Sequence, residues 1–246
     1  MNLPIAASTQ FAAPNLSNRY VHINTQEIIS RMSDEGFYIA TARSTNPRTR
    51  DPLFAKHSIE FRHQDAKEIN GVTPRVIFVN SHDGSSTARF MAGLYRFICS
   101  NGLVIGKTIA EARQRHAGDA AADLIWRMRE MAKRTERAFS QIERWSKIQL
   151  TAPQRNQFAT IAAQLRWGDA RMYSAEEILT PRRAEDDHGD LWSTYNIVQE
   201  NTVRGGLSGL SRSGRRATSR PLADIERDLT FNGQLWQVAE EVAEAV

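Results

Sequence analysis

The 246-residue sequence predicts an α+β fold, in which a curved antiparallel β-meander precedes a helical C-terminal half. Between residues 37 and 105, five short runs rich in β-branched and aromatic residues alternate with turn-forming pairs such as Asp83-Gly84 and Asn101-Gly102. After about residue 110, apolar residues recur every three or four positions, which is the period of a helix. The change of period predicts strands first and helices after them.

The first half is expected to begin with a flexible arm over residues 1–18, because this stretch is small, polar and interrupted by proline. Tyr20–Asn24 alternates like a short strand, and Thr25 is expected to cap a helix that ends at Gly36. A mainly β region then fills the rest of residues 19–110. Its predicted strands are Phe37–Arg43, His57–His63, Arg75–Asn80, Ala88–Ile98 and Leu103–Ile105.

Residues 111–246 are expected to form a helical region that packs on the meander. A helix is predicted from Pro153 to Trp167, another is capped by Asp190 and runs to about Asn201, and Pro221 is placed in the first turn of the last one. An earlier helix carries a heptad-like stripe that suits either the core or a homodimer seam over residues 124–145. The stripe comprises Leu124, Met128, Met131, Thr135, Ala138, Ile142 and Trp145.

Composition narrows the possible partners and the compartment. The formal net charge is +4 and the pI is near 9.4, so partners are expected to be anionic. The single cysteine, Cys99, excludes an internal disulfide framework and a cysteine zinc site, and it is expected to be a small buried side chain. Because the sequence has neither a long apolar run nor a secretory signal pattern, we expect a cytoplasmic protein that does not enter membranes.

Asn80–Ser86 is the segment that most resembles a catalytic motif, because His82 stands beside Asp83. With His57 and His63 it would offer the ligands of a metal-dependent nuclease. However, residues six apart on a strand are roughly 20 Å apart, so His57 and His63 cannot hold one ion. A hairpin tip closed by Asp83-Gly84 is the preferred interpretation. We therefore predict no catalytic residue, no metal ligand and no cofactor, and the nuclease is kept as an alternative.

Arginines are the main candidates for binding. Arg204–Arg220 contains five arginines, four glycines, four serines and no acid, a composition typical of segments that contact phosphate and also of solvated loops. Arginines of the predicted sheet alternate with aromatic residues, which suits either a groove for single strands or a sheet with a solvated face. The candidate residues are Arg75, Arg89, Arg96, Arg182, Arg183, Arg204, Arg212, Arg215, Arg216 and Arg220.

Several short motifs resemble a family borne by plasmids and prophages, domain of unknown function 932 (YfjQ/YubP-like proteins). They are Asp34-Glu35-Gly36-Phe37, Asn80–Ser86, Arg96-Phe97, Asn101–Val104, Ile178–Arg183, Asp190–Ser193, Gln199–Asn201 and Leu235-Trp236. The resemblance runs from about Tyr20 to the C-terminus. It implies an accessory protein of a mobile genetic element, acting in DNA maintenance, recombination or counter-defence, and it carries no catalytic residues to this chain.

These observations lead to one preferred function and two alternatives. The preferred function is binding of single-stranded DNA or RNA without catalysis, of the kind used in annealing or recombination. The first alternative is a counter-defence factor, such as an anti-CRISPR inhibitor, that binds a protein–nucleic acid defence complex. The second is the metal-dependent nuclease.

Overall fold

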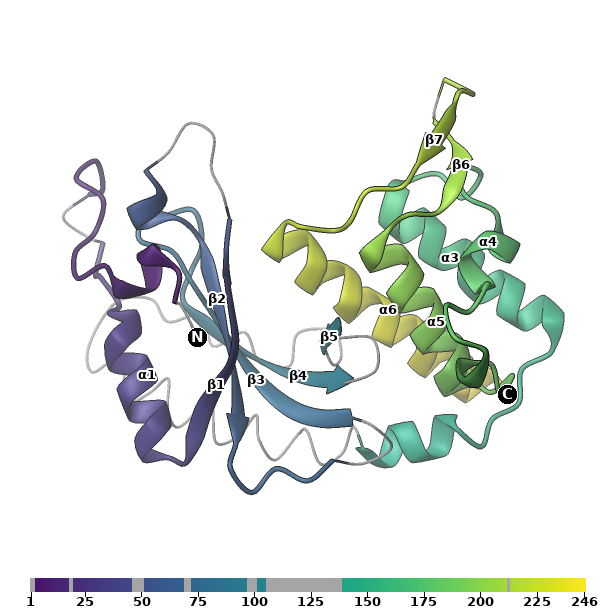
Figure 1. Ribbon diagram of the computed structural model, residues 1–246, viewed down its shortest axis with the longest axis horizontal. Helices are drawn as coiled ribbons and strands as arrows, with labels where there is room; N and C mark the ends of the chain where they lie inside the picture. Colours follow the sequence, from purple (N-terminus) through teal and green to yellow (C-terminus); the bar gives the residue numbers. More distant parts are fainter. Residues whose placement is uncertain are drawn as a thin grey trace. The chain divides into compact units, whose positions relative to one another are not determined.

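The computed structural model describes residues 3–17, 20–45, 51–68, 72–96, 101–104, 139–211 and 213–246 (Figure 1). The chain divides into two compact units, Met1–Glu136 and Arg137–Val246. The first contains an antiparallel sheet and the second is mostly helical, which confirms the predicted α+β class. The expected change of character near residue 110 lies in residues 105–138, outside the described residues.

The sheet of the first unit is a five-stranded meander with the strands in sequence order (Figure 1). Every pair of neighbouring strands is antiparallel, and a bulge interrupts the first pair between Ile39 and Thr41. The strands are β1 (Phe37–Ser44), β2 (His57–His63), β3 (Val72–Asn80), β4 (Arg89–Arg96) and β5 (Asn101–Val104). All five predicted strands are therefore present, and the predicted ends at Ile98 and Ile105 lie outside the described residues.

Helix α1 (Thr25–Asp34) covers one face of this sheet. Its buried Ile28 and Met32 join side chains of β2, β3 and β4 in one core, which includes Ile59, Phe61, Val76, Phe78 and Phe90. Burial of these large apolar side chains is the main source of stability for the unit. The helix ends at Asp34 with Glu35 as its C-cap, and Gly36 follows with a φ of +81°, as the sequence predicts.

Two local predictions for the N-terminal region are wrong. Asn24 caps α1, because its side-chain oxygen accepts the backbone N–H groups of Gln26 and Glu27, whereas Thr25 is buried inside the first turn. Residues 20–24 form no strand. Residues 3–17, within the predicted arm, contain a short 3₁₀ helix, η1 (Ile5–Ser8), and the Ala13 N–H donates to the His82 carbonyl at 2.8 Å.

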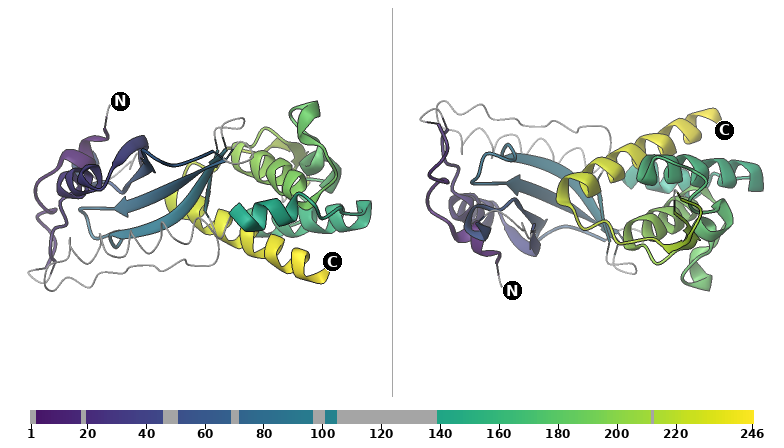
Figure 2. Two further views of the ribbon diagram at one scale, coloured as in Figure 1. Left: turned by 90° about the horizontal axis from the view of Figure 1, so that it is seen from below. Right: turned by 90° about the horizontal axis from the view of Figure 1, so that it is seen from above.

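The second unit is built around α5 (Leu191–Arg204), whose residues 191–202 are all buried. Around it lie the helical residues 139–145, α3 (Ala152–Trp167), α4 (Ala175–Leu179), η3 (Ala184–Asp186) and α6 (Ile225–Ala245). Figure 2 shows α3, α5 and α6 packed side by side. Asp190 caps α5, and Gly168 ends α3 with a φ of +74°, both as predicted.

Two further expectations concern the helices of this unit. The last helix begins at Ile225 with Asp224 as its cap, so Pro221 does not lie in its first turn; the Leu222 N–H instead bonds the Val203 carbonyl and holds this segment against α5. Ile142 and Trp145, at the end of the predicted stripe, are core residues, and the Trp145 ring lies 4.5 Å from that of Trp236. The rest of the stripe lies outside the described residues, and the homodimer seam stays a prediction.

Within Arg204–Arg220, β6 (Ser208–Leu210) and β7 (Arg216–Thr218) pair as a two-stranded ribbon (Figure 1). The Leu210 N–H donates to the Met172 carbonyl at 2.8 Å, and the Gly206 N–H donates to the Ser219 carbonyl at 2.8 Å. Gly209 is required for this attachment, since a β-carbon there would lie 2.2 Å from the Met172 oxygen and 2.5 Å from the Tyr173 ring.

Gly209→Ala is therefore expected to push the ribbon off residues 172–173 and to lower the free energy of unfolding by about 1–3 kcal/mol. Urea unfolding followed by circular dichroism measures the loss. Ser208→Ala, on the same strand but with an exposed side chain, is the control and should change stability by less than about 0.5 kcal/mol. Equal stability of the two variants would show that the ribbon is not held at Gly209.

Candidate polyanion-binding site

The sheet separates its arginines from most of its aromatic side chains. The strand register places Arg43, Arg62, Arg75 and Arg89 on one face, while Phe61, Phe78 and Phe90 lie on the face that α1 covers. The predicted alternation is thus correct, but it puts these rings in the core, where they cannot stack on bases. Only Tyr38, beside Arg62 in the register, is a described, exposed aromatic residue on the arginine face.

The arginines of this face are not presented to solvent as a row of cations. Arg75 and Arg89 are 6% and 7% exposed, and the Arg89 guanidinium donates to Ser86 Oγ at 3.0 Å. Arg43 Nε donates to Ser58 Oγ at 3.3 Å. Arg96 lies on β4 opposite Val72, and its side chain lies outside the described part of the chain. The sheet therefore contributes less accessible cationic surface than its sequence suggests.

Arg182, Arg183 and Arg204 also have protein partners. Arg183 forms ion pairs with Asp186 at 2.7 Å and with Glu200, and the hydrogen bond with Glu200 raises the pKa of Arg183. Arg204 pairs with the same Glu200 at 2.9 Å. Arg182 donates to Asn201 Oδ1 at 2.7 Å and to the Gly205 carbonyl at 2.5 Å. Arg182 and Arg183 thus hold the loop after α4 against α5, whereas the pair between Arg204 and Glu200 lies within α5.

Asn201 completes this network from the helix side. Its side-chain amide donates to the carbonyls of Ile178 and Thr180, both at 2.8 Å. The motif Ile178–Arg183 and the motif Gln199–Asn201 are therefore one bonded structure, although they are separate in the sequence. Buried polar groups that are fully bonded in this way fix a single arrangement of the elements that carry them.

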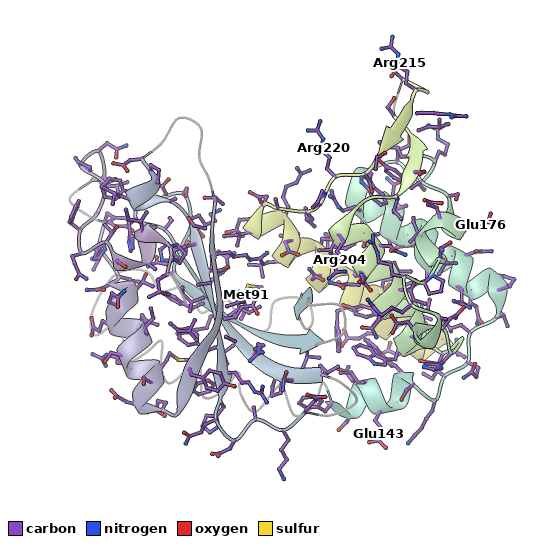
Figure 3. All side chains as sticks on the ribbon, in the orientation of Figure 1. Met91, Glu143, Glu176, Arg204, Arg215 and Arg220 are labelled. Carbon is purple, nitrogen blue, oxygen red and sulfur yellow. The ribbon has the colours of Figure 1, made fainter. Side chains whose placement is uncertain are left out.

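The ribbon and the residues next to it carry exposed arginines of the segment Arg204–Arg220. The side chains of Arg215, Arg216 and Arg220 are exposed, and Figure 3 shows Arg215 at the tip and Arg220 projecting from the irregular segment that leaves the ribbon. The Ser211 N–H donates to the Arg215 carbonyl at 2.7 Å and closes the tip, where Gly214 has a φ of +76°. Arg212 lies outside the described residues. No acid occurs between Arg204 and Arg220, so the ribbon is a cationic projection.

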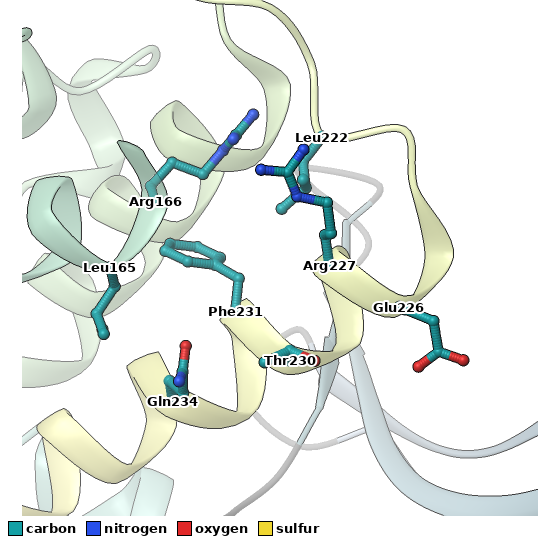
Figure 4. A pocket seen from close by; sticks show the side chains of 8 residues that line it. All are labelled: Leu165, Arg166, Leu222, Glu226, Arg227, Thr230, Phe231 and Gln234. Atoms are coloured by element: carbon teal, nitrogen blue, oxygen red, sulfur yellow. The ribbon is translucent and has the colours of Figure 1, made fainter. Parts of the chain in front are cut away.

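A pocket of about 220 Å³ lies beside the end of the ribbon, between α3 and α6 (Figure 4). Arg166 and Arg227 line it. Arg166 Nη2 donates to the Arg220 carbonyl at 3.0 Å, which connects the pocket to the chain that leaves the ribbon. Neither arginine belongs to a recognisable motif, and the two are far apart in the sequence, so sequence reasoning did not single them out.

The segment Asn80–Ser86 forms the predicted turn. Asp83 Oδ1 accepts the Ser85 N–H at 2.9 Å, and Gly84 has a φ of +74°. His82 is buried with its ring 5.2 Å from His57 and 4.5 Å from His22, a neighbour that the sequence did not suggest. Within the described residues, no group of three or more histidine, cysteine, aspartate or glutamate side chains is placed to hold a metal ion.

The family described as domain of unknown function DUF932 matches residues 15–236, and the chain belongs to this family. It is 34% identical to UPF0380 protein YfjQ of Escherichia coli (strain K12) over 229 residues, which cover 91% of this chain and 82% of YfjQ. It is 35% identical, with the same coverage, to UPF0380 protein YafZ of that strain. No solved structure matches the chain. Among the described helices, none has the length and apolar character to cross a membrane.

Proposed function

We propose that this protein binds single-stranded nucleic acid without catalysis, through phosphate contacts made by the ribbon of β6 and β7. The observation that carries the proposal is the exposure of Arg215, Arg216 and Arg220 on a projecting ribbon that contains no acid. Guanidinium groups donate two parallel hydrogen bonds to phosphate, and the negative backbone of nucleic acid supplies most of the attraction in sequence-independent binding. A role in a mobile genetic element, such as annealing or recombination, belongs to the same proposal.

A counter-defence factor that binds a protein–nucleic acid complex is the second candidate, because Leu210 is 48% exposed on the same ribbon. Arginine is enriched among the residues that dominate protein–protein binding, and the exposed Leu210 side chain beside it offers apolar area to bury. Leu210→Ser separates the two candidates, since it removes the anchor and leaves every cation in place. Under the preferred function, this variant binds nucleic acid as the unmodified protein does.

The double variant Arg215→Gln with Arg216→Gln is expected to weaken binding to a labelled oligothymidine and to reduce the salt dependence of binding. Two lost phosphate contacts should lower the slope of log K against log salt by about 1.4 for a single strand. Fluorescence anisotropy over a salt series measures both effects.

Lys67→Gln with Lys147→Gln is the matched control, because it also removes two exposed charges but lies outside the ribbon. The slope of this control should equal that of the unmodified protein. If the two double variants have the same slope, the ribbon does not bind phosphate. A duplex of the same length, tested in parallel, measures the preference for single strands.

A further inference from the structure

The pocket between α3 and α6 brings two guanidinium groups together over an apolar floor. Figure 4 shows Arg166 from the end of α3 and Arg227 from the first turn of α6 pointing toward one another above the Phe231 ring. Leu165 and Leu222 contribute further apolar walls. Glu226 also lines the pocket, but its carboxylate points away from the space between the two arginines.

Arg166 is held in place by the fold and keeps one nitrogen for a ligand. Its Nε donates to the Thr202 carbonyl at 3.1 Å, and its Nη2 donates to the Arg220 carbonyl. No described residue bonds its Nη1. Arg227 is exposed, and within the described part of the chain its guanidinium has no hydrogen-bond or ion-pair partner. Arg166 is thus a preorganised donor, and both guanidiniums offer the charge-assisted N–H groups that bind anions strongly.

Two like charges in one pocket repel each other unless an anion lies between them. Burial and the positive charge of Arg227 lower the pKa of Arg166, and the nearby Tyr173 and Asp228 only partly oppose this. The Asp228 carboxylate is buried and accepts a hydrogen bond from Asn232 Nδ2 at 2.7 Å. The charge imbalance favours binding of an anion from solution.

We propose that Arg166 and Arg227 form a binding site for a phosphate group. A volume of about 220 Å³ is several times the ~30 Å³ that one water molecule occupies in the liquid, so the pocket has room for a phosphate and part of an attached sugar. The apolar floor suits the sugar, and the two planar guanidiniums suit the phosphate oxygens. Arg166 is bonded to Arg220 at the end of the ribbon, so the pocket would extend the proposed nucleic-acid-binding surface. The inference rests on the proposed function for the source of the phosphate.

Inorganic phosphate is the direct probe. In the full-length protein, it is expected to raise the Tm by about 3–5 °C at ten times its Kd, compared with sodium chloride of equal ionic strength. Arg227→Gln should abolish this rise, and this change at an exposed position is expected to leave the fold intact. Lys147→Gln, which also removes one exposed charge, should retain it.

The salt dependence of oligonucleotide binding distinguishes the source of the phosphate. If the site takes a phosphate of the nucleic acid backbone, Arg227→Gln should also lower the slope by about 0.7. If Arg227→Gln leaves the slope unchanged but phosphate no longer raises its Tm, the ligand is a free phosphate or nucleotide, and the site is still supported. The proposed site would be overturned if phosphate raised the Tm of Arg227→Gln and of the unmodified protein equally, or of neither. The ribbon double variant tests the proposed function separately, because it leaves both pocket arginines in place.

Discussion

Glu200→Ala is expected to lower the free energy of unfolding of the second unit by about 3 kcal/mol. The Glu200 side chain is 3% exposed and is bonded by both Arg183 and Arg204. Among the described residues, its removal leaves Arg183, which is 22% exposed, with Asp186 as its one ionic partner. Loss of one of its two carboxylates is costly because the mostly buried guanidinium is then only partly neutralised. Urea unfolding monitored by circular dichroism measures the difference.

Glu143→Ala is the control for this prediction. Glu143 also pairs with a cation, Lys147, at 3.0 Å, but their side chains are 66% and 73% exposed. Exposed pairs of this type contribute about 0.5 kcal/mol or less. If Glu200→Ala and Glu143→Ala reduce stability equally, the network around α5 does not hold the loop after α4, and Arg182 and Arg183 again become candidates for binding a ligand.

Local patterns in the sequence predicted the elements well because the forces that form them are local. Asp83-Gly84 marks a turn because glycine adopts positive φ and the aspartate side chain accepts a nearby N–H, and both features are present. Gly168 ends α3 for the same conformational reason. The ribbon was missed because Gly205, Gly206 and the serines suggest a flexible segment, while its attachment depends on Met172 and Tyr173, which are distant in the sequence.

The candidate site was predicted less well because charge composition does not reveal partners. Arg182 and Arg183 stand out as cations in the sequence, but whether they meet solvent or polar groups of α5 depends on how the loop after α4 folds onto that helix. Arg166 and Arg227 were overlooked for the converse reason, since only the packing of α3 against α6 brings them together. Arg215, Arg216 and Arg220 were predicted and are exposed, which is why the proposed function depends on them.

The buried histidines of the first unit predict a loss of stability in acid. His82 is fully buried, with His57 and His22 beside it. Burial, followed by the charges that His57 and His22 would carry, lowers the pKa of His82 from 6.5 to about 4, and the nearby Asp83 opposes this only in part. Burial also lowers the pKa of His57 and of His22. Protonation of this cluster is therefore unfavourable while the unit is folded.

The direction of the effect follows from the protons that each state binds. Between pH 6.5 and about pH 4 the unfolded chain protonates this histidine while the folded chain does not, so the free energy of unfolding decreases as the pH falls through this window. The full shift in the pKa of His82 corresponds to about 3 kcal/mol of unfolding free energy. Solvent screening around the half-buried His22 reduces this to about 2 kcal/mol. Stability from this source is fully present above pH 6.5.

Urea unfolding at a series of pH values from 7.5 to 4 tests this prediction. His82→Phe keeps a ring in the cluster but cannot bind a proton, so its stability should depend less on pH by about 2 kcal/mol over the window. His63→Gln is the control, because His63 lies at the far end of β2 with a side chain that is 36% exposed. A pH dependence that is the same in both variants would mean that His82 does not limit the acid stability of the sheet unit.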